Sequence, residues 1–131
     1  MDEADARDLA TYAQLVEHMI LSLLDALRRS DLLLRVAAWE VFDPTPATAR
    51  LAAARGRALG AWVEARRGDL VAPDGADYGA INATLIAAVQ QLALSAKATG
   101  TFGGVSLQTE ADWDRIRAVL RKLVHAAYVT G

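Results

Sequence analysis

One long uncharged run interrupts the pattern of polar and apolar positions, the nineteen residues from Tyr78 to Ala96. Wound as a helix, this segment has no obvious face for water, and a helix that is apolar or uncharged all round is normally buried on every side. A chain of 131 residues has few places to bury such a helix. We therefore expect a central helix that packs on its own bundle and also on a second copy of the chain.

At 100° per residue, the two sides of this helix differ in character. One arc is branched and apolar, as an intramolecular core requires, and contains Ile81, Leu85, Ile86, Val89 and Leu92. The opposite arc is small or polar but uncharged, and contains Ala80, Ala83, Thr84, Ala87, Gln90, Gln91 and Leu94. Small residues let helix backbones approach closely, and glutamine amides can pair across a symmetric interface because each copy offers donor and acceptor. This second arc is the predicted interface between two copies.

A transmembrane span is the competing interpretation of the same run, since about 20 apolar residues suffice to cross a bilayer. The lack of aromatic belts and basic flanks argues against it. So do the polar residues within the run, which are Asn82, Thr84, Gln90, Gln91 and Ser95. We expect a helix buried in protein and no association with a membrane.

Apolar residues that recur at threes and fours predict five helices in all. Local signals mark several of their starts: Ser30 or Asp31 can cap the second helix, and Thr45, before a proline, can cap the third. Thr109 begins a capping-box pattern with Asp112 in place of the usual Glu or Gln. The expected bounds are about 5–29, 31–42, 46–67, 76–98 and from 110 to near the C-terminus.

The segments between these helices predict loops and no strands. Residues 68–75 are rich in turn formers, and residues 101–108 (TFGGVSLQ) form an expected flexible connector. Runs of Val, Ile and Thr with period two are absent, so strands have no support. The second helix carries only Arg35 and Glu40 as charges, so we expect it to be mostly buried. The expected fold is all-α, an orthogonal or antiparallel five-helix bundle that forms a single domain over residues 1–131.

Composition agrees with one helical domain. A chain of this length fits a single domain and buries about two thirds of its unfolded surface. Alanine, the strongest helix former, supplies 28 residues, whereas only eight residues are aromatic. Arg outnumbers Lys twelve to two, which together with the alanine excess is typical of a GC-rich bacterial genome.

Charge and cysteine content exclude several classes of function. The net charge is −2, so the chain as a whole has no electrostatic basis for binding nucleic acid. It contains no cysteine, which excludes disulfides, thiolate metal sites and cysteine nucleophiles. The N-terminal sequence MDEADARDL is acidic, unlike a signal or transit peptide. We expect a cytoplasmic protein.

Patterns for catalysis or metal binding find little support. His18 and His125 are the only histidines, and neither belongs to an H-E-x-x-H or Glu-x-x-His motif. Glu17 points about 100° away from His18 on a helix, so the two cannot share a metal without outside help. We expect no catalytic residue, no metal and no cofactor. A small enzyme that uses His18 or Glu40 in a bundle cavity is the least favoured alternative.

Aromatic and polar residues among the apolar stretches can meet where the first four helices converge. Aromatic walls with a few polar groups describe a small-molecule pocket. They also describe an ordinary helical core, in which Trp and Tyr find hydrogen-bond partners. The predicted ligand-binding set is Tyr12, Met19, Trp39, Phe42, Trp62, Asn82 and Ile86.

The order of these elements resembles the middle and end of a tetracycline-repressor (TetR) family regulator. The likeness is carried first by the block DLLLRVAAWEVFDPTPATARLAAARGRALGAWVEARRGDL at positions 31–70. It continues in the long uncharged helix, in the glycine-containing loop after it, and in a final helix that opens with TEADWDRIRAVLRKLV at positions 109–124. The resemblance covers nearly the whole chain and depends on a pattern rather than on an invariant motif.

This resemblance implies a C-terminal effector-binding and dimerisation domain. In the family, the last two long helices of each subunit pair with their copies as a four-helix bundle, and the ligand cavity lies among the preceding helices. Here the implied dimer interface consists of Ala83, Ala87, Gln90, Gln91, Leu94, Trp113, Leu120 and Val124.

The implied function is that of a ligand-sensing and dimerisation domain that binds a small apolar effector and has a second copy of itself as partner. Family members begin with a helix-turn-helix domain, and only a short acidic stretch precedes the first predicted helix here. We therefore expect no operator binding by this chain alone. The alternative is a helical homodimeric interaction module with a filled core and no ligand.

Overall fold

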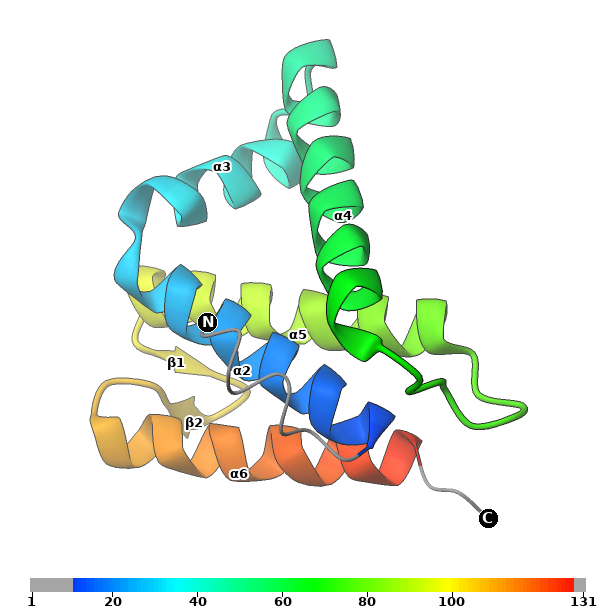
Figure 1. Cartoon of the computed structure of the whole chain (residues 1–131). Helices are drawn as coiled ribbons and strands as arrows, with labels where there is room; N and C mark the ends of the chain where they lie inside the picture. Colours follow the sequence, from blue (N-terminus) through cyan, green and yellow to red (C-terminus); the bar gives the residue numbers. More distant parts are fainter. Residues whose placement is uncertain (1–10, 129–131) are drawn as a thin grey trace.

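The computed structural model describes residues 11–128, and five helices contain most of them (Figure 1). In chain order they are α2 (Tyr12–Arg29), α3 (Asp31–Phe42), α4 (Pro46–Arg67), α5 (Tyr78–Ala98) and α6 (Glu110–Ala127). The prediction of an all-α fold is confirmed, since a two-stranded hairpin is the only sheet within residues 11–128. The part of the first predicted helix at positions 5–10 lies outside the described residues.

A side-chain oxygen caps the N-terminus of each of these helices and accepts a backbone N–H that has no partner inside the helix. Ser30 takes this role for α3, and Thr45 takes it for α4. At α6, Thr109 and Asp112 form a reciprocal capping box in which Asp replaces the longer Glu. The predicted starts of these three helices are confirmed, and α5 begins two residues later than predicted, after its cap Asp77.

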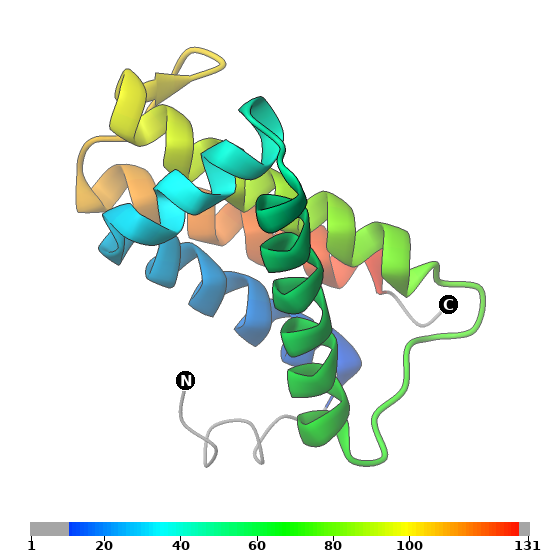
Figure 2. The same cartoon turned by 90° about the horizontal axis from the view of Figure 1, so that it is seen from above.

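Three helices form the body of the molecule. α2 lies alongside α5 in the same direction, and α6 runs antiparallel to both (Figures 1 and 2). Residues three and four apart lie on one helix face, so each of the three helices presents an apolar stripe to a shared core. The most deeply buried members of that core are Leu15, Val16, Ile20, Leu24, Leu27, Val89 and Val124.

α3 and α4 form an arm on this body. α4 crosses α2 and α5 at a steep angle and meets α3 at the top of the view in Figure 1. The prediction that α3 is mostly buried is wrong, because only Leu34 and Ala37 are buried, both in its first seven residues. The second half of α3 extends beyond the body, where α4 packs along one side of it and leaves Trp39, Val41 and Phe42 exposed. No residue of α4 is buried, although Leu59, Trp62 and Val63 pack against the core.

The expected flexible connector contains a β-hairpin instead. Strands β1 (Thr101–Phe102) and β2 (Val105–Ser106) pair antiparallel across Gly103 and Gly104. Both glycines have positive φ angles, 58° and 80°, which favour the tight turns that match the twist of a two-residue hairpin. After the hairpin, Leu107 is buried in the core. The link between α5 and α6 is therefore structured and fixes where α6 begins.

α5 is buried along one face only. Leu85, Val89 and Ala93 face the core, while Ala80, Thr84, Ala87 and Gln91 are exposed. The single chain covers only part of the circumference of α5, and burial of the opposite side against a second copy stays a prediction. By length and composition α5 is the one helix in the described range that is apolar enough to cross a membrane.

Candidate functional site

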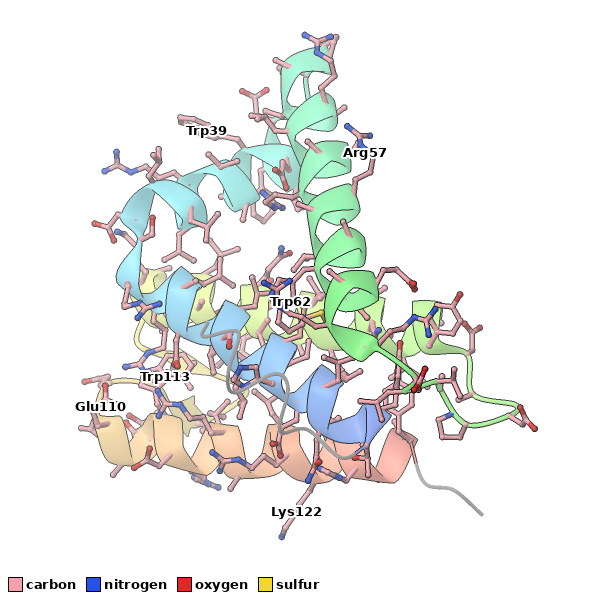
Figure 3. All side chains as sticks on the ribbon, viewed as in Figure 1. Trp39, Arg57, Trp62, Glu110, Trp113 and Lys122 are labelled. Atoms are coloured by element: carbon pink, nitrogen blue, oxygen red, sulfur yellow. The ribbon has the colours of Figure 1, made fainter. Side chains whose placement is uncertain are left out.

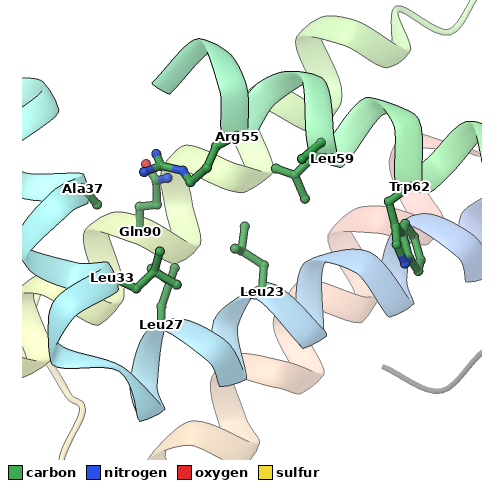
Figure 4. Close-up of a pocket in the computed structure, with 9 residues that line it drawn as sticks. Leu23, Leu27, Leu33, Ala37, Arg55, Leu59, Trp62 and Gln90 are labelled. Carbon is green, nitrogen blue, oxygen red and sulfur yellow. The ribbon is translucent and has the colours of Figure 1, made fainter. Parts of the chain in front are cut away.

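An apolar cavity of about 290 Å³ lies between α2, α3, α4 and α5 (Figure 4). All four helices contribute to its wall. Seven of its nine lining residues are apolar: Leu23, Leu27, Leu33, Ala37, Ala58, Leu59 and Trp62. The other two are Arg55 and Gln90. Ligand pockets in proteins have this character, with mostly apolar walls and a few placed polar groups.

The helical repeat explains how the sequence builds this wall. α4 contributes positions 55, 58, 59 and 62, which lie on one face because they are separated by three, four and seven residues. Leu23 and Leu27 are one turn apart at the edge of the α2 stripe, between the shared core and the arm. Alanine at positions 37 and 58 leaves space that a larger side chain would fill. Small residues on the arm therefore help to form the cavity.

A bidentate ion pair lies beside this cavity. Arg55 donates from Nη1 to Glu40 Oε1 and from Nη2 to Glu40 Oε2, each at 2.5 Å. The Glu40 side chain is 10% exposed and the Arg55 side chain 33%. The pair joins α3 to α4. In it, the negative charge of Glu40 balances Arg55, the only charged residue in the lining. Each Glu40 oxygen accepts one of these bonds, so the carboxylate holds α3 against α4.

Gln90 is the uncharged polar residue in the lining. It was predicted at the interface between two copies. Its side chain instead lines the cavity, on the side of α5 that faces the arm. Among the described residues, no group forms a hydrogen bond with its side-chain amide. Figure 4 shows the polar ends of Gln90 and Arg55 at one end of the cavity, with Trp62 at the other. The cavity is thus apolar along most of its wall and polar at one end.

A second cavity of about 280 Å³ lies between α2, α4 and α5. It is lined by four members of the predicted ligand-binding set, Tyr12, Met19, Asn82 and Ile86, and it shares Leu59 with the first cavity. Small residues of α4 and α5 complete much of the wall: Gly56, Gly60, Gly79 and Ala83. A Cβ placed on Gly56 or Gly60 would meet nothing within 4 Å, so these glycines border open space rather than a tight helix contact.

A tyrosine pair closes one side of the second cavity. The ring of Tyr12 meets the ring of Tyr128 edge to face, with centroids 5.2 Å apart. The Tyr128 hydroxyl donates to Asn82 Oδ1 at 2.7 Å. Burial raises the pKa of both phenols, and for Tyr12 a hydrogen bond with Asn82 offsets part of the rise. Both phenols are therefore neutral at neutral pH. Tyr12 and Asn82 line the second cavity together with the charged Glu64, and Tyr128 supports them from outside the lining.

The predicted ligand-binding set is only partly brought together. Trp62 lines the first cavity, and four other members line the second. Trp39 and Phe42 line neither, with exposed fractions of 53% and 77%. Figure 3 shows Trp39 on α3, away from the body and well separated from Trp62. The structure does not bring these two residues to either cavity, because periodicity identifies the apolar side of α3 without showing where neighbouring helices end.

The residues of the predicted dimer interface do not share one surface either. Those on α6 are buried in the core. Trp113, Leu120 and Val124 are buried within the chain, so they are core residues and cannot meet a second copy. The sequence indicates an apolar stripe on α6 correctly, but a stripe does not specify its partner. In the structure that partner is α2, which also receives the charged flank of α6: Arg117 donates to Asp25 at 3.0 Å.

On α5 the predicted interface residues lie on two sides. Ala83 lines the second cavity, Gln90 lines the first, and Leu94 packs against the core. Ala87 and Gln91 remain exposed, as the interface prediction requires.

Exposed, uncharged residues occur on both α5 and α6, and we group them as a proposed uncharged face. We use this name for Ala80, Thr84, Ala87 and Gln91 of α5 together with Val119 and Leu123 of α6. Val119 and Leu123 are 49% and 51% exposed and were missed in the sequence, although they lie one turn apart beside the core stripe of α6. On α5, the Thr84 hydroxyl donates to the Ala80 carbonyl and the Gln91 amide donates to the Ser95 hydroxyl.

No family model, curated protein or solved structure matches this chain. Between residues 11 and 128, no group of three or more His, Asp or Glu side chains could hold a metal ion.

Proposed function

We propose that the chain is the ligand-sensing and dimerisation domain of a TetR-type transcriptional regulator that binds a small apolar effector. The single observation that carries the proposal is the 290 Å³ apolar cavity between α2, α3, α4 and α5. The cavity is partly open to solvent, so its apolar wall is in contact with water until an apolar ligand covers it. A cavity of this size, bordered by four helices, is better explained as space for a ligand than as a packing defect.

The order and shape of the elements support the same proposal. A protruding arm of α3 and α4 is followed by the long uncharged α5, a glycine-containing turn and a final amphipathic helix, as the resemblance implies. The uncharged face offers small and apolar groups on two antiparallel helices, which suits pairing with an identical face around a twofold axis. The proposed assembly is a soluble homodimer, with no nucleic-acid binding through this chain alone.

Binding of toluene tests the ligand-sensing proposal. Toluene is apolar and smaller than the cavity, so it should raise the midpoint of thermal unfolding by mass action. Ala37→Leu fills the cavity from α3 and should abolish the toluene effect while leaving the protein folded. Ala38→Leu, the neighbouring position outside the cavity lining, is the matched control and should bind as the wild type does. A wild-type protein whose unfolding midpoint and amide chemical shifts do not respond to saturating toluene would rule out a ligand cavity.

One observation favours the alternative, a homodimeric interaction module without a ligand. The uncharged face is formed by α5 and α6, whereas the first cavity lies on the arm side of α2 and α5. Dimerisation can therefore exist without ligand binding. A dimer that fails to bind toluene identifies the interaction module, and a dimer that binds it identifies the sensor.

A further inference from the structure

The polar end of the first cavity indicates what kind of molecule it accepts. Gln90 presents a side-chain amide that has no hydrogen-bond partner among the described residues. Gln90 is half-buried, so water can reach its amide while the cavity is empty. A ligand that displaces this water loses affinity unless it supplies a hydrogen bond in its place. The amide can donate through its nitrogen and accept through its oxygen. A ligand oxygen at this end would satisfy it.

Charge balance at the same end opposes an ionised ligand. Arg55 is the only charged residue of the lining, and both terminal nitrogens of its guanidinium already donate to Glu40. A carboxylate placed beside this pair would add an unbalanced negative charge among seven apolar side chains. Taking a charge out of water without a counter-charge is strongly unfavourable. A neutral ligand avoids this cost and can still accept a spare N–H of Arg55.

The apolar part of the cavity wall indicates the chemistry of the rest of the ligand. Leu23 and Leu59 lie between the polar end and Trp62, and neither side chain offers a hydrogen bond (Figure 4). At about 30 Å³ for each water-sized group, 290 Å³ holds roughly ten non-hydrogen atoms. The space suits a short hydrocarbon with one oxygen at its end.

We propose that this cavity selects a neutral, medium-length hydrocarbon with a terminal carbonyl or hydroxyl oxygen, and that it rejects the corresponding carboxylate. The oxygen binds the Gln90 amide, and the hydrocarbon lies between Leu23 and Leu59 towards Trp62. This inference rests on the proposed ligand-sensing function and specifies the chemical class of the effector. In this arrangement the Glu40–Arg55 pair acts as a charge filter, because it leaves the polar end with donors but without net charge.

Calorimetric titration at pH 7 with two probes of equal size tests the selection. 2-Nonanone and octanoate each have ten non-hydrogen atoms and differ in charge at the polar end. The wild-type chain should bind 2-nonanone at least tenfold more tightly than octanoate. Equal or tighter binding of octanoate overturns the inference. Toluene serves as the reference, since it fits the cavity without any oxygen.

Two substitutions assign the selection to the residues that we name. Gln90→Leu should weaken 2-nonanone binding by about threefold to tenfold, the loss of one net hydrogen bond, and leave toluene binding unchanged. Gln91→Leu, the neighbouring glutamine on the uncharged face, is the matched control and should not change either affinity. Glu40→Gln leaves Arg55 unbalanced, and it should raise the affinity for octanoate at least tenfold. Unchanged octanoate binding in this variant overturns the charge-filter role.

These outcomes separate the inference from the function on which it rests. If the folded wild type binds neither toluene nor 2-nonanone, the ligand-sensing proposal fails, and the inference fails with it. If it binds toluene and also prefers octanoate, the sensing proposal stands and only the neutral-ligand class is wrong.

Discussion

Trp62 and Trp39 lie on the two helices of the arm and have opposite environments. Trp62 lines the first cavity, packs against the core and has the Arg66 guanidinium 4.7 Å from its ring centre. Trp39 is 53% exposed and lines neither main cavity. Both belong to the same predicted ligand-binding set, so the structure turns one prediction into a comparison of two substitutions.

Trp62→Ala should weaken toluene binding more than tenfold and lower the free energy of unfolding by about 2 kcal/mol, because it removes a large apolar contact. Trp39→Ala should leave binding unchanged and alter the free energy of unfolding by no more than about 0.5 kcal/mol. Calorimetric titration and urea unfolding measure the two quantities. Equal effects of the two substitutions would show that the wrong indole has been assigned to the cavity.

Two adjacent residues of α6 test the correction to the predicted interface. Val124 is fully buried in the core, whereas Leu123 is half exposed on the uncharged face. Val124→Ala should cost about 2 kcal/mol of the free energy of unfolding, since it removes two buried methyl groups and leaves a void. Leu123→Ala should act mainly on dimerisation and reduce the association constant. Urea unfolding, with both variants at one protein concentration, distinguishes the two roles. A larger loss of stability in the Leu123 variant would contradict the core role of Val124 and favour its predicted place at the dimer interface.

At the scale of elements, the start of α6 is held by one carboxylate. Asp112 accepts the backbone N–H groups of Gln108 and Thr109, each at 3.0 Å, and the hydroxyl of Ser106 at 2.8 Å. These bonds lower its pKa from 3.8 to about 2, with the two backbone donors as the largest causes. The carboxylate thus connects β2 to the first turn of α6.

The stability contributed by Asp112 should therefore depend on pH. Its pKa in the folded protein lies below the unfolded value of 3.8, so the contribution is fully present above that value and is lost as the pH falls towards 2. Asp112→Asn should destabilise the protein at pH 7, and the difference from the wild type should shrink between pH 4 and pH 2. Urea unfolding across this range measures it. Asp74→Asn, an exposed loop position, is the control; a difference between Asp112→Asn and the wild type that does not change with pH would refute the role of the ionised carboxylate.

For the whole molecule, the proposed dimer depends on the uncharged face. Its members on α5 include Ala87 and Gln91, both exposed in the single chain. Ala87→Arg introduces a charge at this face, where a symmetric partner would place an identical charge opposite it. The substitution should convert a dimer to a monomer in sedimentation equilibrium. Ala54→Arg, on an exposed position of α4, is the matched control and should remain dimeric. A dimer that survives Ala87→Arg with unchanged stability means that a different face is used.

Much of the fold is predictable from local signals, because these act over three or four residues. Ser30, Thr45 and Thr109 cap helices at the expected positions, since a hydroxyl that accepts the N–H three residues later needs no tertiary context. The hairpin was missed although Gly103 and Gly104 are a strong turn signal. Its strands are only two residues long, too short for an alternating pattern to show.

The candidate site was less predictable, because a periodic pattern shows which side of a helix is apolar without showing what covers it. The apolar stripe of α6 fits a second copy as well as it fits α2, and only the packed structure assigns Leu120 and Val124 to the core. In the same way, Gln90 and Gln91 are neighbours in the uncharged run, yet the 100° step between them places one in a cavity and the other outside.

By itself, the sequence determined the helices, most of their ends and the uncharged character of α5. These properties follow from side-chain periodicity, caps and the absence of charge, all of which are local. Only the tertiary structure decided that the arm borders an apolar cavity, that Glu40 and Arg55 neutralise each other at its polar end, and that Val119 and Leu123 of α6 are exposed. Those outcomes depend on how five helices cross, and the crossing brings together residues far apart in the chain.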